Sequence, residues 1–224
     1  MSNNVFREAP TSSRLTIYFD DNHNGDGLST LEDYKAIFDK HFIGTQFQDV
    51  MEWCSGPAFV GFTFLAEGLF RNLVCADIEA DVERSINKTL EHKPNYNHRV
   101  KFIHSDCFDN IDQKFDLIVG NPPHFIDDSS QEYKTFLKRN IDHKSEYDCD
   151  RTAIDWDWSA HKKFFRQVRQ HLKPGGYVIL NENAQGATEE TFEEMIAESG
   201  LQKYAVHVST NPSRPFYWYM ILKG

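Results

Sequence analysis

An amide side chain, two prolines and two aromatic rings follow one another in the stretch "GNPPHF", residues 120–125. The amide of Asn121 carries a carbonyl acceptor and an NH₂ donor. Proline fixes φ and has no N–H group, so the Pro122 carbonyl is able to face a site without a competing turn hydrogen bond. These two acceptors suit one planar amine or amide nitrogen. The pattern therefore favours chemistry in which a nucleophilic nitrogen is positioned before an electrophile.

Two aromatic side chains compete for the position beside that nitrogen. His124 is the first ring after the prolines, and an imidazole titrates near neutrality. One interpretation has His124 stack on the substrate and act as a base as well. In the other interpretation Phe125 stacks on the substrate, and His124 faces water.

Groups that suit a nucleoside ligand stand at the ends of two earlier apolar runs. Glu52 ends the first run and is able to accept hydrogen bonds from a ligand ammonium. Gly56, in the turn that follows, lets the backbone approach a ligand beside a helix N-terminus. Asp77 ends the second run and suits hydrogen bonds to two ribose hydroxyls, with Ile78 over a flat ring. The alternative role of Asp77 is an ordinary helix cap.

A third apolar run ends in "SDCF", residues 105–108. The Asp106 carboxylate is able to accept a hydrogen bond from an exocyclic amine, and the Cys107 N–H is able to donate to a ring nitrogen. Together they would read the edge of an adenine. A turn aspartate without a ligand is the alternative interpretation of Asp106.

Short apolar runs alternate with helical patterns from about residue 48 onward, which predicts an α/β fold with helices on both faces of a mostly parallel sheet. Two consecutive strands at the end predict an antiparallel C-terminal strand in a seven-stranded, Rossmann-like sheet. Ligands bind outside the carboxyl ends of the strands in such sheets, where the chemical groups above would gather. Strands are predicted at 48–53, 72–77, 99–106, 115–121, 177–183, 203–209 and 215–222, and helices at 59–69, 79–92, 158–173 and 188–199.

The order of "EWCSGP", "CADIE", "SDCF" and "DLIVGNPPHF" resembles the class I S-adenosylmethionine-dependent methyltransferases. Within that class it resembles the Asn-Pro-Pro-aromatic group, which includes adenine-N6 and protein-glutamine methyltransferases. The resemblance covers roughly residues 45–224 and implies S-adenosylmethionine as the cofactor. It implies that Glu52 and Gly56 face the methionine part, Asp77 the ribose, Asp106 the adenine, and Asn121, Pro122 and His124 the nucleophile.

The first strand-to-helix turn departs from that group. Cys54 and Ala58 stand at positions where its members usually carry glycine. A different pose of the methionine part would follow from such a change, and with it a different reaction.

The segment 1–45 is predicted to place a Gly-rich turn and a helix over the cofactor, ahead of a catalytic domain at 46–224. Ser29 is the predicted N-cap of that helix, with Glu32 at the capping-box position. A calcium-binding loop over Asn22–Asp33 is the competing interpretation, but several of its ligand positions carry the wrong residue types. No other spacing indicates a metal site.

The long charged stretch 126–157 follows the Asn-Pro-Pro motif directly and is predicted to be a substrate lid. Phe125 beside it, and Tyr133, Tyr147 and Trp156 within it, are candidates to line the substrate site. For each lid aromatic the alternative is packing of the lid on the body of the protein.

The chain has a formal net charge of −10, so a nucleic acid is a disfavoured partner. It shows no apolar stretch of membrane-spanning length, no secretory signal and no paired cysteine pattern, which predicts a cytoplasmic protein.

The predicted function is N-methyl transfer from S-adenosylmethionine to an amine or amide of a small molecule or peptide. One alternative on the same fold transfers or cyclises the aminocarboxypropyl group and releases methylthioadenosine. The other alternative is a non-catalytic S-adenosylmethionine-binding module, such as one half of a heterodimer.

Overall fold

The computed structural model describes residues 6–11, 15–20, 23, 27–140, 150 and 152–224. The main sheet contains β3 (Phe47–Trp53), β4 (Phe70–Asp77), β5 (Val100–His104), β6 (Phe115–Gly120), β7 (Leu172–Asn183), β8 (Gln202–Val208) and β9 (Tyr217–Lys223). The α-helices are α1 (Leu31–His41), α2 (Phe59–Ala66), α3 (Glu83–Glu91), α4 (Gln131–Asn140), α6 (Ser159–Val168) and α7 (Glu189–Ser199). Short 3₁₀ turns occupy η2 (Gly27–Thr30), η3 (Ala80–Val82), η4 (Pro94–Tyr96), η5 (Trp156–Trp158) and η6 (Arg169–His171).

The seven strands lie in the order β5-β4-β3-β6-β7-β9-β8. The first five are parallel, and β9 runs antiparallel to its neighbours β7 and β8. The predicted seven-stranded, mostly parallel sheet with an antiparallel C-terminal strand is therefore confirmed. The central strand β6 is apolar because both of its faces are covered, and Leu117, Ile118 and Val119 are all fully buried.

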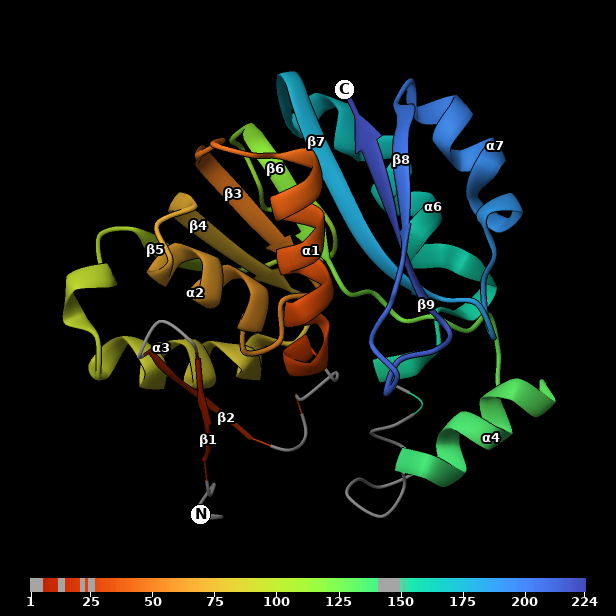
Figure 1. The fold of residues 1–224 in the computed structure, drawn as a ribbon, viewed down its shortest axis with the longest axis horizontal. Helices are drawn as coiled ribbons and strands as arrows, with labels where there is room; N and C mark the ends of the chain where they lie inside the picture. The colour runs from red at the N-terminus through yellow and green to blue at the C-terminus, as the bar shows by residue number, and fades with distance from the viewer. Residues whose placement is uncertain (1–5, 12–14, 21–22, 24–26, 141–149, 151) are drawn as a thin grey trace.

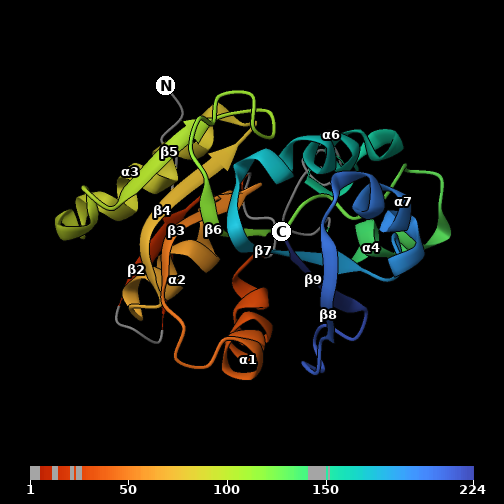
Figure 2. The same cartoon turned by 90° about the horizontal axis from the view of Figure 1, so that it is seen from above.

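Helices cover both faces of the sheet, as the alternation of strands and helices predicts (Figures 1 and 2). On one face, α1 and α2 bury side chains such as Tyr34 and Phe62 against the strands. On the other face, α6 and α7 bury Phe164 and Phe192. The sheet thus separates two hydrophobic cores.

Three local features differ from the sequence prediction. An additional hairpin, β1 (Arg7–Pro10) and β2 (Thr16–Phe19), packs on α3, where the Tyr18 N–H donates to Thr89 Oγ1 at 2.9 Å. The charged insertion contains α4, which lies away from the sheet in Figure 1. The prediction that Ser29 caps α1 is wrong, because α1 begins after Thr30 and the Ser29 hydroxyl instead accepts a hydrogen bond from Arg214.

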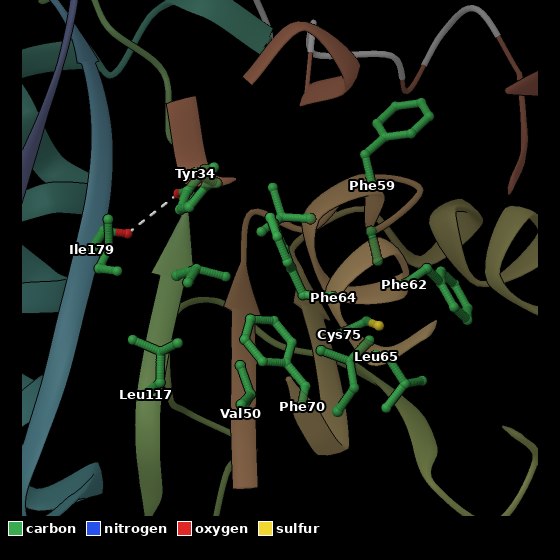
Figure 3. Close-up of a cluster of buried hydrophobic side chains, with 14 of the residues drawn as sticks. Tyr34, Val50, Phe59, Phe62, Phe64, Leu65, Phe70, Cys75, Leu117 and Ile179 are labelled. Atoms are coloured by element: carbon green, nitrogen blue, oxygen red, sulfur yellow. Dashed lines mark hydrogen bonds between the residues drawn. The ribbon is translucent and has the colours of Figure 1, made fainter. Parts of the chain in front are cut away.

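The helix α1 is fixed to the sheet by its buried face. The Tyr34 hydroxyl donates to the carbonyl of Gly120 at 3.1 Å and to the carbonyl of Ile179 at 3.4 Å, and so joins α1 to β6 and β7. Figure 3 shows the hydrogen bond to Ile179. One turn later, Phe38 packs in a ring cluster, with its centroid 4.7 Å from that of Phe64 and 5.7 Å from that of Phe70. The helix α1 is therefore part of the hydrophobic core.

None of the helices in the described part of the chain combines the length and apolar character that a membrane crossing requires.

We expect Phe38→Ala to lower the free energy of unfolding by about 3–5 kcal/mol, because it empties a site inside this ring cluster. The measurement is urea denaturation followed by tryptophan fluorescence. Ile43→Ala is the matched control, because Ile43 is 82% exposed close to the same helix end, and its cost should stay within about 0.5 kcal/mol. Equal effects of the two variants would contradict the assignment of α1 to the core.

Candidate active site

A cavity of about 320 Å³ opens at the carboxyl ends of β3, β4 and β6, within the size range of ligand pockets. Residues of the segment before β3 also line it, and so does Thr152 from the insertion. The full lining consists of His23, Gly27, Tyr34, Glu52, Cys54, Ser55, Gly56, Pro57, Phe59, Val60, Asp77, Ile78, Glu79, Val82, Gly120, Asn121, Pro123 and Thr152.

The register of the parallel strands brings the predicted groups together. Trp53, the last residue of β3, pairs with Ala76 on β4 and with Gly120 on β6. Residues that flank this row therefore meet at one edge of the sheet, and Glu52, Asp77 and Asn121 line the same cavity. This meeting was predictable because the carboxyl ends of parallel strands share an edge.

Glu52 lies buried beneath the first turn of α2. One of its carboxylate oxygens accepts a hydrogen bond from the Gly61 N–H at 2.6 Å. Burial raises the pKa of Glu52 to about 8, although hydrogen bonds from the backbone N–H groups of Gly61 and Val60 oppose that rise. A cationic ligand group beside Glu52 would stabilise its ionised form.

The turn between β3 and α2 keeps a backbone that favours glycine, although two of its residues carry side chains. Cys54 has φ +51° and Ala58 has φ +59°, both in the left-handed region. Gly56 has φ +45°, and a Cβ atom there would lie 2.8 Å from the His23 carbonyl oxygen. The chain therefore folds back closely over this turn, and the departures at Cys54 and Ala58 leave the left-handed turn in place.

Asp77 stabilises the same turn through both of its oxygens. Oδ2 accepts from the Gly56 N–H at 2.8 Å, and Oδ1 accepts from the Glu79 N–H at 3.0 Å. Burial raises the pKa of Asp77 in spite of these hydrogen bonds. Ile78 lies beside it with 59% of its surface exposed, so it presents an apolar face at the cavity wall.

The structure does not place Asp106 and Cys107 on this cavity. Asp106 is exposed and forms an ion pair with Lys163 of α6 at 2.6 Å. Cys107 adopts φ +50° and is buried, and its thiol lies 3.5 Å from the Ala160 carbonyl. The turn after β5 thus directs both side chains toward α6, and the two predicted adenine contacts are not brought together with Glu52 and Asp77.

The Asn-Pro-Pro segment contributes Asn121 and Pro123 to the cavity wall, whereas Pro122 is buried and is not part of the lining. The Asn121 oxygen accepts a hydrogen bond from the Nδ2 group of Asn181, a residue of β7. The Asn181 oxygen in turn accepts from Nη2 of Arg214 at 3.3 Å. The Asn121 amide, which was predicted to hold a nucleophile, is therefore hydrogen-bonded to a buried residue, Asn181.

Neither ring of the motif lines the cavity. The backbone N–H groups of His124 and Phe125 both donate to the Ala153 carbonyl at 2.9 Å, which ties the motif to the insertion. The His124 ring is only 6% exposed, and its Nδ1 lies 3.5 Å from a carboxylate oxygen of Glu182. The interpretation that His124 faces water is wrong, because Glu182 lies against its ring inside the protein.

A buried chain of charged groups continues from His124 into the core. The other Glu182 oxygen lies 3.1 Å from His161 Nε2, and His161 Nδ1 lies 2.7 Å from Asp155 Oδ2. Burial alone would lower the pKa of His161, but Glu182 and Asp155 outweigh it and raise the pKa to about 9. Burial would likewise raise the pKa of Asp155, yet its hydrogen bond with His161 holds the pKa below its usual value. His161 is therefore an imidazolium between two carboxylates at neutral pH.

The insertion forms a small core of its own against the motif. Phe125 and Tyr133, each 1% exposed, pack together with Ala153 and Ile154. Phe125 also pairs with Ile154 in an isolated β-bridge. These two predicted substrate contacts are packing residues in the structure, and Trp156 is 55% exposed away from the cavity lining. Tyr147 lies outside the described residues.

The calcium-loop interpretation receives no support from its described positions. Asp33, its last predicted ligand, is buried and accepts hydrogen bonds from Tyr219 at 3.0 Å and Ser209 at 2.9 Å. Asn22, Asn24 and Asp26 lie outside the described residues. Within the described ranges, His, Cys, Asp and Glu form no group of three that could hold a metal ion.

The sequence did not reveal the buried polar residues that contact the Asn-Pro-Pro motif and their partners. The only available signal was the polar end of "YVILNEN", because a run of polar residues in a buried strand must find partners. The lone Arg214 in a turn gave no signal. The missed residues of the cavity wall and its supports include His23, Tyr34, Asp155, His161, Asn181, Glu182 and Arg214.

Comparison with known proteins places the chain in a family. The family model described as Eco57I restriction-modification methylase matches residues 17–208. This chain belongs to the Eco57I restriction-modification methylase family. The predicted resemblance to class I methyltransferases of the Asn-Pro-Pro group is thereby confirmed.

Three similar proteins illustrate the range of the family and of the fold. A ribosomal protein uL3 glutamine methyltransferase of Francisella tularensis is 35% identical over 180 residues, covering 78% of this chain and 48% of the relative. A bifunctional methyltransferase of Rickettsia prowazekii is 29% identical over 139 residues, covering 62% of this chain and 26% of the relative. The 16S rRNA N2 G1207 methyltransferase of Thermus thermophilus, solved with AdoMet and guanosine, has a TM-score of 0.61 at 17% identity, covering 98% of this chain and 50% of that one.

This chain spans about a quarter of the length of the bifunctional methyltransferases that it matches. The structural match at 17% identity shows the fold, which agrees with the strand order described above.

We expect the His161 ring to stay protonated at neutral pH and to lose its proton near pH 9, because two carboxylates face it. Its stabilising effect is then fully present below the unfolded-state pKa of about 6.5 and is lost as the pH rises through about 9. The measurement is an NMR titration of the imidazole nitrogens, with Glu182→Gln expected to lower the His161 pKa. A His161 ring that loses its proton near the unfolded-state pKa of about 6.5 would contradict the buried imidazolium.

Proposed function

We propose that this chain transfers a methyl group from S-adenosylmethionine to a side-chain amide nitrogen, with a protein glutamine as the acceptor. The observation that carries the proposal is that Asn121 lines the same cavity as Glu52 and Asp77. Asn121 would hold the acceptor nitrogen, and Glu52 and Asp77 would hold the nucleoside. Methyl transfer requires both bound molecules in one cavity, and these three residues line the same one.

The charge of the cavity supports the cofactor. Glu52, Asp77 and Glu79 line it, and the described lining residues include neither lysine nor arginine. S-adenosylmethionine carries a sulfonium and an ammonium group, so an acidic wall attracts it. A dinucleotide pyrophosphate would meet repulsion from the same wall. The turn at Gly56 is tight, because the His23 carbonyl lies close to it, and a nucleoside could lie against this turn.

The proposed roles follow from position on the cavity wall. Glu52 would accept hydrogen bonds from the ligand ammonium, Asp77 from the ribose, and the exposed face of Ile78 would cover the adenine. When bound, the sulfonium supplies an electrophilic methyl group. The Asn121 oxygen would accept a hydrogen bond from the acceptor N–H, which orients the nitrogen for attack. The Pro122 carbonyl, predicted to share this role, belongs to a buried residue outside the cavity lining.

A protein acceptor is supported by the glutamine methyltransferase among the relatives and by the charge of the chain. That relative is named for the glutamine of a ribosomal protein, which offers the planar amide that the Asn-Pro-Pro pattern suits. The family name refers to restriction-modification, but a net charge of −10 repels a phosphate backbone. A peptide carries no such phosphate backbone and does not meet this repulsion.

The aminocarboxypropyl alternative and the non-catalytic alternative are separable by product. Methyl transfer releases S-adenosylhomocysteine, aminocarboxypropyl transfer releases methylthioadenosine, and a binding module releases neither. Cys54 and Ala58 adopt the positive φ angles that glycine would adopt, so the turn keeps its usual shape. A different pose of the methionine part, on which the aminocarboxypropyl alternative depends, is therefore not favoured.

Asn121→Ala should lower kcat by at least about 10²-fold and leave the Kd for S-adenosylmethionine within about threefold, because Asn121 holds the acceptor and not the cofactor. Turnover of glutamine-containing peptides and calorimetry are the two measurements. Asn97→Ala, in an exposed turn, is the control and should match the wild type. Full turnover in Asn121→Ala would remove Asn121 from the site.

Binding of S-adenosylmethionine at about pH 7 should release a proton, because Glu52 has a pKa of about 8 in the free protein and must ionise beside the ligand ammonium. The readout is calorimetry in two buffers that differ in ionisation enthalpy. Glu52→Gln should abolish the release, whereas the exposed Glu91→Gln should retain it. Buffer-independent binding enthalpies in the wild-type protein would show that Glu52 does not meet the ammonium.

A further inference from the structure

The amide of Asn121 is the last member of a hydrogen-bonded series that begins at a buried arginine. Arg214, 2% exposed, donates through Nη2 to the Asn181 oxygen at 3.3 Å. Asn181, which is fully buried, donates through Nδ2 to the Asn121 oxygen. These hydrogen bonds thus connect the residue after β6, a residue of β7 and the turn before β9.

The direction of this series is fixed by chemistry. A guanidinium has only donors, so it requires the oxygen of Asn181 on its side. The NH₂ group of Asn181 must then face Asn121, and only the oxygen of Asn121 can accept from it. A flipped Asn121 would bring two NH₂ groups together in a buried place. The amide orientation, which coordinates alone often leave open, is set here by the arginine.

The arginine itself is held on three sides. Its Nε lies 3.6 Å from Asp33 Oδ2, and its Nη1 donates to the Ser29 hydroxyl. Its guanidinium carbon lies 3.6 Å from the centroid of the Tyr217 ring. Asp33 is fixed in turn by the Tyr219 hydroxyl at 3.0 Å. The donor at the start of the series therefore has little freedom to turn.

We propose that Asn181 and Arg214 are positioning residues, which hold the Asn121 amide in one orientation so that its oxygen remains an acceptor for the substrate N–H. The proposal rests on the methyl transfer proposed above and adds no bond-breaking step. An amide oxygen has two lone pairs, so one oxygen is able to accept from the Asn181 NH₂ group and from a substrate N–H together.

Two substitutions of Asn181 separate orientation from packing. Asn181→Ala removes the donor and frees the Asn121 amide, and we expect kcat to fall by about 10-fold. Asn181→Asp keeps the size and a partner for Arg214 but offers Asn121 only acceptors, so the Asn121 amide should turn its NH₂ group inward. We expect the larger loss, about 10²-fold, in Asn181→Asp, with the KM for S-adenosylmethionine unchanged in both variants.

Thr89→Val is the matched control, because it removes a hydrogen bond of a buried residue outside this series, the one that the Tyr18 N–H donates to Thr89 Oγ1 of α3 at 2.9 Å. Its kcat should stay within about twofold of the wild type. Arg214 is not the first choice for substitution, since its loss leaves Asp33 without its cation inside the core.

A second readout does not depend on turnover. The side-chain ¹H–¹⁵N resonances of Asn121, identified by their disappearance in Asn121→Ala, should form one sharp pair in the wild-type protein. They should broaden in Asn181→Ala and move to new positions in Asn181→Asp. The control Thr89→Val should leave them unchanged.

An equal kcat in wild type, Asn181→Ala and Asn181→Asp would overturn the proposal, and so would unchanged Asn121 resonances in both variants. If the wild-type protein methylates no glutamine peptide, the proposed acceptor fails, while the resonance shifts still decide whether Arg214 and Asn181 orient Asn121.

Discussion

The polar end of β7 is the constraint on which the candidate site depends. Successive residues of a strand point to opposite faces, so Asn181 and Glu182 reach to opposite sides of the sheet. Asn181 holds Asn121 at the start of the Asn-Pro-Pro motif, and Glu182 lies against His124 at its end. One strand thereby fixes both ends of a loop that two prolines already stiffen.

Polar groups in a core cost free energy unless they are paired, and this chain pairs them through two separate networks. On one face, Arg214 and Asp33 stabilise Asn181 and bring the residues before β3 into contact with the turn before β9. On the other face, His161 lies as a cation between Asp155 and Glu182. Such networks define one arrangement of a site better than apolar packing does, because a displaced polar group loses its partners.

The fold and one wall of the cavity were predictable from the sequence, since they follow from periodicity and from where parallel strands end. Glu52, Asp77 and Asn121 meet because β3, β4 and β6 are neighbours in register. Asp106 does not line the cavity and forms an ion pair with Lys163, a residue distant in sequence. The burial of His124, Phe125 and Tyr133 depends on partners in the insertion and on β7, and residue types alone do not reveal such partners.

The central claim is that one cavity presents a methyl donor to an amide nitrogen held by Asn121. The most direct test is incubation of the protein with S-adenosylmethionine labelled in its methyl group and a mixture of peptides that offer glutamine, asparagine and lysine, followed by mass spectrometry of peptides and nucleosides. The account predicts label on glutamine and release of S-adenosylhomocysteine. Release of methylthioadenosine, or label confined to lysine, would contradict it.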